Sequence, residues 1–209
     1  MRISKDPEER KTEILDVAER LFTSKGYSKT TISDILDEIG VARGTFYYHF
    51  KSKEEVMDAI IMRIVNANTA VAKAIANDDS LPCLVKMLQI LFSAQSKSGG
   101  GEEKIIEQLH QPSNAEMHQK SLVMMVTHLA PILTQVVEQG ISENIMAVEY
   151  PYETVEMLLA CAAVIFDAGL FSCEAEATAK KAYAMVNMAE AALGTDKGAL
   201  SEIMKVIMG

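Results

Sequence analysis

Apolar residues recur at helical spacing along almost the whole chain, and this periodicity restricts the fold more than any other feature. Residues 6–9 (DPEE) have the composition of a helix start, with an N-cap acceptor, proline at the first helical position and an acid at the third. The apolar residues that follow share one helical face until Gly26, where we expect the helix to end. The best strand candidate, residues 145–150, is too short to matter. The sequence therefore predicts an all-α protein.

Two short helices are predicted next. Residues 31–34 (TISD) form a capping box, and apolar residues then repeat every three or four positions until Gly40, which can supply a left-handed C-cap. After a tight turn, Phe46 and Phe50 lie one helical turn apart and are expected to face the core. The opposite face, at about 100° per residue, is centred on Tyr48 and also presents Gly44, Thr45, Tyr47 and His49.

A long helix follows these two. Residues 52–55 (SKEE) predict its start, and no helix breaker occurs before about Asn77, so it would extend roughly 37 Å at 1.5 Å per residue. That length can connect two domains. Pro131 lies inside a later helical pattern and should kink it. Further helices are predicted near residues 82–95, 102–111, 114–139, 152–171, 173–193 and 199–208.

Length and composition favour one or two well-cored soluble domains. The chain has 209 residues, of which 49% are hydrophobic, and its only linker-like stretch is residues 95–101 (QSKSGGG). We expect a DNA-binding domain at residues 1–53 and a larger domain at 54–209. The longest uncharged run, residues 121–137, contains histidine, proline and glutamine, and the N-terminus has no apolar signal core. Neither membrane spanning nor export is expected.

The three cysteines point to a reducing compartment. Cys83, Cys161 and Cys173 form no C-x-x-C pair, and their number is odd. None has a basic neighbour in sequence of the kind that activates a redox-sensing thiol. We expect buried free thiols in a cytoplasmic protein.

Charge is distributed unevenly along the chain. Residues 1–53 hold 10 Lys+Arg and 9 Asp+Glu, whereas the remainder holds 10 and 20, which makes the net charge −9. Residues 41–53 contain Arg43, Lys51 and Lys53 and no acid. A local positive patch on an acidic body is compatible with DNA binding, because phosphate contacts depend on the local surface.

Two short helices joined by a glycine-containing turn, the second with polar and aromatic residues exposed, describe a helix-turn-helix. The literal strings are more specific: residues 26–35 (GYSKTTISDI) and 40–54 (GVARGTFYYHFKSKE). The chain resembles the N-terminal domain of the tetracycline-repressor (TetR) family of bacterial transcriptional regulators over about residues 8–58. The rest agrees with that family in length and helical content.

The resemblance implies DNA-contact roles at the matched positions. Thr31 would cap the second helix and hold a phosphate, Gly44 would allow close approach to the groove, and a set of side chains would reach bases or fix the backbone: Arg43, Thr45, Tyr47, Tyr48, His49 and Lys53. Independently, Tyr and Thr hydroxyls contact phosphates or bases, and Lys and Arg release counterions. The alternative is a merely solvated helix face. The chain departs from the family pattern at Ala42, commonly Ser, and at Leu36 and Ile39, often Ala.

The resemblance also implies dimerisation and ligand binding in the larger domain. Residues 152–171 and 173–193 are rich in small residues, as in the family's four-helix dimer interface; the alternative is that these residues pack within one subunit. A pocket is expected among the helices of residues 53–139, with Met62, Phe92, Met124, Met125 and His128 as ligand-binding residues. Methionine also fills ordinary cores, so a core role is the alternative.

Other chemistries have little support in the sequence. His110, His118 and His128 are separated by 8 and 10 residues, which is not an i, i+4 metal pair, so neither a metal nor a cofactor is expected. Nucleophile elbows, phosphate loops and zincin motifs are lacking, so we do not expect an enzyme. The leading hypothesis is a ligand-responsive transcriptional regulator, a repressor, whose partners are an operator in double-stranded DNA, a small apolar effector and a second copy of itself, with no membrane partner. The alternative is a helical small-molecule or lipid-binding protein without specific DNA binding.

Overall fold

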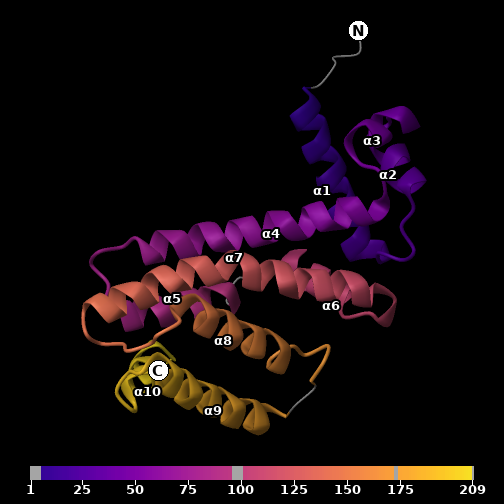
Figure 1. Cartoon of the computed structure of the whole chain (residues 1–209). Helices are drawn as coiled ribbons and strands as arrows, with labels where there is room; N and C mark the ends of the chain where they lie inside the picture. Colours follow the sequence, from indigo (N-terminus) through magenta and orange to yellow (C-terminus); the bar gives the residue numbers. More distant parts are fainter. Residues whose placement is uncertain (1–5, 96–100, 172–173, 209) are drawn as a thin grey trace. The chain divides into compact units, whose positions relative to one another are not determined.

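The computed structural model describes residues 6–95, 101–171 and 174–208, and within these residues the chain is helical without a strand (Figure 1). The all-α prediction is confirmed. Cys173 and most of the predicted linker lie outside the described residues. The helices are α1 (Pro7–Lys25), α2 (Ile32–Ile39), α3 (Arg43–His49), α4 (Lys53–Ala76), α5 (Cys83–Gln95), α6 (Gly101–Leu109), the 3-10 turn η1 (Pro112–Asn114), α7 (Ala115–Ser142), α8 (Pro151–Ile165), α9 (Ala175–Leu193) and α10 (Ala199–Met208).

The chain divides into two compact units. The first comprises Met1–Ile64 with Ser98–Ser121, and the second comprises Val65–Lys97 with Leu122–Gly209. These bounds differ from the expected boundary after residue 53. The start of α4 belongs with α1–α3, and α6, which was expected in the larger domain, packs against α1.

The predicted caps set the bounds of the first helices. Asp6 accepts a hydrogen bond from the Glu8 N–H at the start of α1, and Gly40 ends α2 with a φ of 71°. Ala42 gives α3 no side-chain cap, as its identity implies. The core of this unit contains fully buried side chains from α1, α2 and α3, namely Ile14, Phe22, Ile35 and Phe46.

The second unit has its own apolar core. Residues of α5, α7, α8 and α10 meet there, among them Ile90, Val136, Leu159 and Leu200. Helix α7 continues through Pro131. Helix α8 ends at Ile165, six residues before the predicted end, because the Asp167 carboxylate accepts the N–H groups of Gly169 and Leu170 and so closes a turn.

Within the described ranges, two helical segments are long and apolar enough to cross a membrane by length and composition alone: Lys53–Ala76 and Pro112–Ser142. The first segment carries Arg63, whose guanidinium forms ion pairs with Asp16 and Glu19 of α1. A guanidinium held in ion pairs with another helix agrees with the expectation that this segment packs within the protein and does not face lipid.

Candidate DNA-binding surface and ligand cavity

Helix α3 presents a polar and aromatic face on the first unit. Phe46 and Phe50 are buried, as predicted, and α3 packs against α2. On the other side, Tyr48 is 75% exposed and Tyr47 is 47% exposed. Gly44 is exposed as well, and Thr45 and His49 lie half-buried at the sides. The structure thus brings the predicted α3 residues onto one accessible face.

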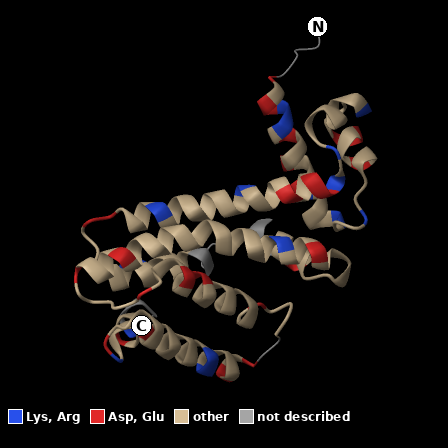
Figure 2. Ribbon diagram, in the orientation of Figure 1, with Lys and Arg blue, Asp and Glu red and all other residues tan. Residues whose placement is uncertain are grey.

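Cations near α3 are available for a ligand, unlike most of those on α1. Arg20 pairs with Glu38 at 2.6 Å and Lys25 with Asp34 at 2.8 Å. Arg43, by contrast, lies over the Tyr47 ring, 5.8 Å from its centroid, and Lys51 is exposed. Neither takes part in an ion pair with any residue that the structure describes. Blue and red segments alternate on the helices of this unit in Figure 2.

Thr31 caps α2 through reciprocal hydrogen bonds with Asp34. Its hydroxyl donates to the Asp34 carboxylate at 2.7 Å and accepts from the Asp34 N–H at 3.1 Å. Lys25 and the two donors of Thr31 hold the pKa of Asp34 well below its usual range. The capping role of Thr31 is confirmed. A phosphate contact through its hydroxyl would have to replace the bond to Asp34.

Lys53 is already bound within the protein. Its ammonium donates to the carbonyl oxygens of Tyr27 and Thr30 at 2.9 and 3.0 Å and lies 4.2 Å from the centroid of the Tyr27 ring. Partial burial lowers the pKa of Lys53, against the opposite influence of Glu54. Lys53 therefore holds the turn between α1 and α2 against the start of α4, a position that differs from the free phosphate contact expected from the sequence.

Tyr27 also joins α6 to this turn. Its N–H donates to Gln108 Oε1 at 3.1 Å, and its hydroxyl donates to Glu54 at 3.4 Å. Burial and the charge of Glu54 raise the pKa of Tyr27. Sequence reasoning missed Gln108, because it lies 81 residues from Tyr27 and no local pattern links them.

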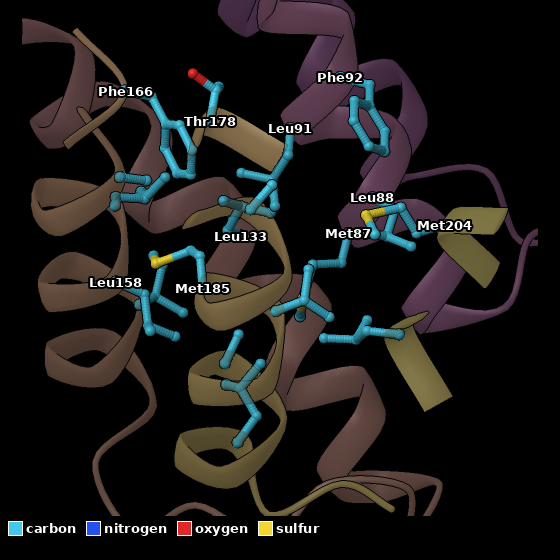
Figure 3. A pocket seen from close by; sticks show the side chains of 18 of the residues that line it. Met87, Leu88, Leu91, Phe92, Leu133, Leu158, Phe166, Thr178, Met185 and Met204 are labelled. Atoms are coloured by element: carbon cyan, nitrogen blue, oxygen red, sulfur yellow. The ribbon is translucent and has the colours of Figure 1, made fainter. Parts of the chain in front are cut away.

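The second unit contains a cavity of about 570 Å³ (Figure 3). Its walls come from α5, α7, α8, α9 and α10, and Thr178 is the polar side chain among otherwise apolar ones. The lining residues are Met87, Leu88, Leu91, Phe92, Leu133, Val155, Leu158, Leu159, Ala162, Phe166, Ala175, Thr178, Ala179, Ala182, Met185, Val186, Ala189, Leu193, Leu200 and Met204.

The cavity contains one of the five predicted ligand-binding residues, Phe92. Met62 belongs to the first unit, and Met124, Met125 and His128 lie on α7 outside the lining. His128 Nδ1 is 2.8 Å from the carbonyl oxygen of Met124. The sequence signal that could have found the lining residues of α9 is the row of apolar positions on one side of residues 175–193.

Helices α8 and α9 also carry large apolar side chains that nothing within the described chain covers. Met157 is 66% exposed and Tyr183 is 50% exposed, and Val164 and Met188 are exposed too. Between Met157 and Ile165, α8 contains no charged residue, and its ribbon there is tan in Figure 2. Single exposed apolar residues are common, but several of them on two helices that contact each other are typical of an interface.

Two of the three histidines considered as metal ligands, His110 and His118, lie close together. His110 and His118 lie at either end of η1 in the first unit, and the turn brings their ring centroids to 4.9 Å. Spacing in the sequence did not reveal this pair. A zinc site usually takes three or four protein ligands, so the pair could supply part of one. Cys83 is buried as a free thiol and Cys161 is half-buried and free.

Comparisons with known proteins agree with this arrangement. The family profile "Bacterial regulatory proteins, tetR family" matches residues 14–60, and "Tetracyclin repressor-like, C-terminal domain" matches residues 98–188. The HTH-type transcriptional regulator TtgR of Pseudomonas putida is 32% identical over 95 residues, 44% of this chain and 45% of TtgR. This chain thus spans under half the length of the first curated relatives it matches.

Solved structures share the fold at low identity. A TetR-family transcriptional regulator from Mesorhizobium loti superposes with a TM-score of 0.61 at 15% identity, over 90% of this chain and 98% of that one. SmeT, the repressor of the Stenotrophomonas maltophilia multidrug efflux pump SmeDEF, gives a TM-score of 0.60 at 20% identity, over 90% and 91%. These likenesses show a common architecture.

Proposed function

The chain belongs to the TetR family of bacterial transcriptional regulators, and on that premise we propose that it is a repressor that binds its operator as a homodimer and is released by a small, largely apolar effector. Regulators of this family bind operator DNA and small molecules, act as dimers and are not enzymes. Such a protein works in the cytoplasm, where the DNA is.

The observation that carries the DNA-binding role is the exposed, acid-free face of α3. Tyr47 and Tyr48 offer hydroxyls to bases or phosphates, and Arg43 and Lys51 offer charge that no carboxylate of the described chain neutralises. Gly44 lacks a side chain that could keep the helix from the groove. The N-terminal half of α3 is the part of a recognition helix that reads base edges.

The exposed apolar residues of α8 and α9 support the homodimer. Met157 and Val164 on α8, with Tyr183 and Met188 on α9, would pack against the same residues of a second copy across a two-fold axis. A two-fold dimer places two recognition helices on half-sites roughly 34–36 Å apart. This spacing predicts a palindromic operator.

The cavity supports the effector role. Its volume of about 570 Å³ lies within the roughly 300–1,000 Å³ of pockets that take drug-sized ligands. An effector releases the operator if it binds the DNA-competent arrangement more weakly than the released one. By linkage, operator DNA must then weaken effector binding by the same factor.

Selection of DNA from a random pool tests the proposal. We expect the purified protein to enrich a palindrome, and Arg43→Ala and Tyr48→Ala each to bind it at least ~10-fold more weakly. Lys205→Ala is the matched control, because it removes an exposed cation that pairs with Glu202 on α10, a helix that carries neither the recognition face nor the proposed dimer face. Failure to enrich any sequence would favour the alternative, a helical small-molecule or lipid-binding protein.

A further inference from the structure

The turn between α6 and α7 brings two imidazoles together on the first unit. Helix α6 ends at Leu109, and the His110 N–H still donates to the Ile106 carbonyl oxygen at 3.0 Å. Pro112, the first residue of η1, has no N–H with which a helix could continue. The chain therefore turns at η1, and His118 follows in the first turn of α7.

The two rings lie within reach of a single metal ion. Their centroids are 4.9 Å apart, and their planes cross at 61°. One ring nitrogen of His110 and one of His118 lie within 4.8 Å of each other. A tetrahedral zinc ion, which holds each nitrogen at roughly 2.0–2.1 Å, needs the two nitrogens about 3.3 Å apart. The nitrogens therefore have to approach by no more than about 1.5 Å to share an ion.

A buried oxygen without a hydrogen bond lies in the same turn. Asn114 is 2% exposed, and its side-chain nitrogen donates to the Gln108 carbonyl oxygen at 2.7 Å. Its Oδ1 is buried too, and it accepts no hydrogen bond from any residue that the structure describes. Asn114 precedes His118 by four residues, and the helical conformation of Pro112–Ser142 places both on one face. A buried oxygen without a partner costs free energy that a bound ion would recover.

The donors of this turn suit a late first-row divalent ion. Imidazole nitrogen is a preferred ligand of zinc, copper and nickel, and an oxygen ligand is compatible with all three. Magnesium and calcium take oxygen ligands instead, so two imidazoles discriminate against them. Folding has already closed the turn between the two histidines, so an ion that binds both rings pays little further ordering entropy.

We infer that His110, His118 and Asn114 form a binding site for a late first-row divalent metal ion, with water as the remaining ligand. The spacing of eight residues argued against a metal pair in the sequence, but the turn at η1 brings the rings together all the same. All three residues belong to the first unit, and none lines the cavity. The inference goes beyond the proposed function and does not rest on it.

Calorimetric titration of the whole, reduced protein with Zn²⁺ tests the site, provided that the chain carries no polyhistidine tag. His110→Gln and His118→Gln should each weaken Zn²⁺ binding at least ~100-fold, because the loss of a direct ligand costs no less than the loss of its supporting partner. His128→Gln is the matched control: it removes an imidazole of α7 that lies 2.8 Å from the Met124 carbonyl oxygen, and it should leave the affinity unchanged. Mg²⁺ should not bind.

Electron paramagnetic resonance with one equivalent of Cu²⁺ counts the imidazoles directly. The unaltered protein should show hyperfine coupling to two imidazole nitrogens, and either histidine variant should show coupling to one. Asn114→Leu removes the amide oxygen and should weaken Zn²⁺ binding about tenfold while both imidazoles remain in the spectrum. Melting curves check that each variant is folded, and the spectrum of the unaltered protein does not depend on them.

Equal Zn²⁺ affinity of the unaltered protein and both histidine variants would overturn the inference, and so would the absence of Zn²⁺ binding or a spectrum with one imidazole. Unchanged affinity of Asn114→Leu would remove Asn114 from the ligand set. The cysteines are present in every variant, so binding to thiols does not affect the comparison. Failure to select an operator would remove the repressor proposal and leave the metal site standing.

Discussion

Replacing Lys53 by methionine separates a structural role of this lysine from a phosphate contact. Methionine keeps most of the aliphatic stem and removes the ammonium that donates to the carbonyls of Tyr27 and Thr30. A hydrogen bond from a charged donor contributes about 1.5–3 kcal/mol when well buried. Because Lys53 is only half-buried, water can replace part of the loss, and we expect the two bonds together to be worth about 1–2 kcal/mol.

The free energy of unfolding and the salt dependence of DNA binding give independent readings. Urea unfolding followed by circular dichroism should show that Lys53→Met lowers the free energy of unfolding by about 1–2 kcal/mol. Each phosphate contact contributes about 0.9 to the slope of log K against log salt. We therefore expect Lys53→Met to weaken operator binding with little change of slope, because the turn that carries Thr31 is less well held.

Lys51→Met is the matched control. Lys51 is exposed, two residues away, and its side chain makes no ion pair within the described chain, so its loss should reduce the slope by about 0.9 and leave stability unchanged. If Lys53→Met showed the reduced slope together with parental stability, the hydrogen bonds seen here would not be what Lys53 contributes, and the phosphate role expected from the sequence would hold instead.

Four further substitutions test other parts of the structure. Met157→Arg places a guanidinium on the exposed apolar face of α8 and should convert dimers into folded monomers by light scattering; an unchanged mass would refute that interface. Gly194→Ala should lower the free energy of unfolding by more than ~2 kcal/mol, because its φ is 63° and a Cβ would lie 2.4 Å from the Ala147 carbonyl oxygen. Gly198→Ala, also at positive φ but in open space, should cost about 1 kcal/mol. The buried Glu190 carboxylate accepts N–H bonds from residues 198, 200 and 201; although desolvation opposes this, the bonds lower its pKa from the usual value of a glutamate. The stabilisation should therefore be present at neutral pH and be lost as the pH falls through the lowered pKa, and this acid sensitivity should be absent from Glu190→Gln in melting curves.

Features that depend on a few consecutive residues were predictable. The capping box of Thr31 and Asp34, the left-handed Gly40 and the uncapped Ala42 all appear as expected, because each arises from interactions within one helical turn. The exposed face around Tyr48 followed from the burial of Phe46 and the helical period alone. Asp167 shows the limit of periodicity: the apolar pattern continues past it, yet its side chain closes a turn and α8 ends.

Contacts between distant segments were not predictable from one sequence. Lys53 satisfies carbonyls 23 and 26 residues earlier, and a lysine at the start of a helix next to a recognition helix looks the same whether it faces DNA or its own protein. The domain boundary was likewise placed by sequence pattern at residue 53, whereas packing joins α6 to α1 and carries the first unit to Ile64. Such pairings depend on tertiary packing, which overrides local patterns.

Helix α9 explains why the sequence indicated only part of the cavity lining: Met87, Phe92 and Leu133 lie in the expected range of residues 53–139, whereas the wall formed by α9 lies outside it. Small residues occur on both sides of this helix, so its sequence suggested a close helix–helix interface. The structure gives the two sides different neighbours: Ala182 and Met185 line the cavity, while Tyr183 and Met188 are exposed. Because one helix forms the wall of the cavity and also the proposed dimer face, a ligand that shifts α9 must alter the dimer contacts, and dimerisation must alter ligand affinity by the same factor.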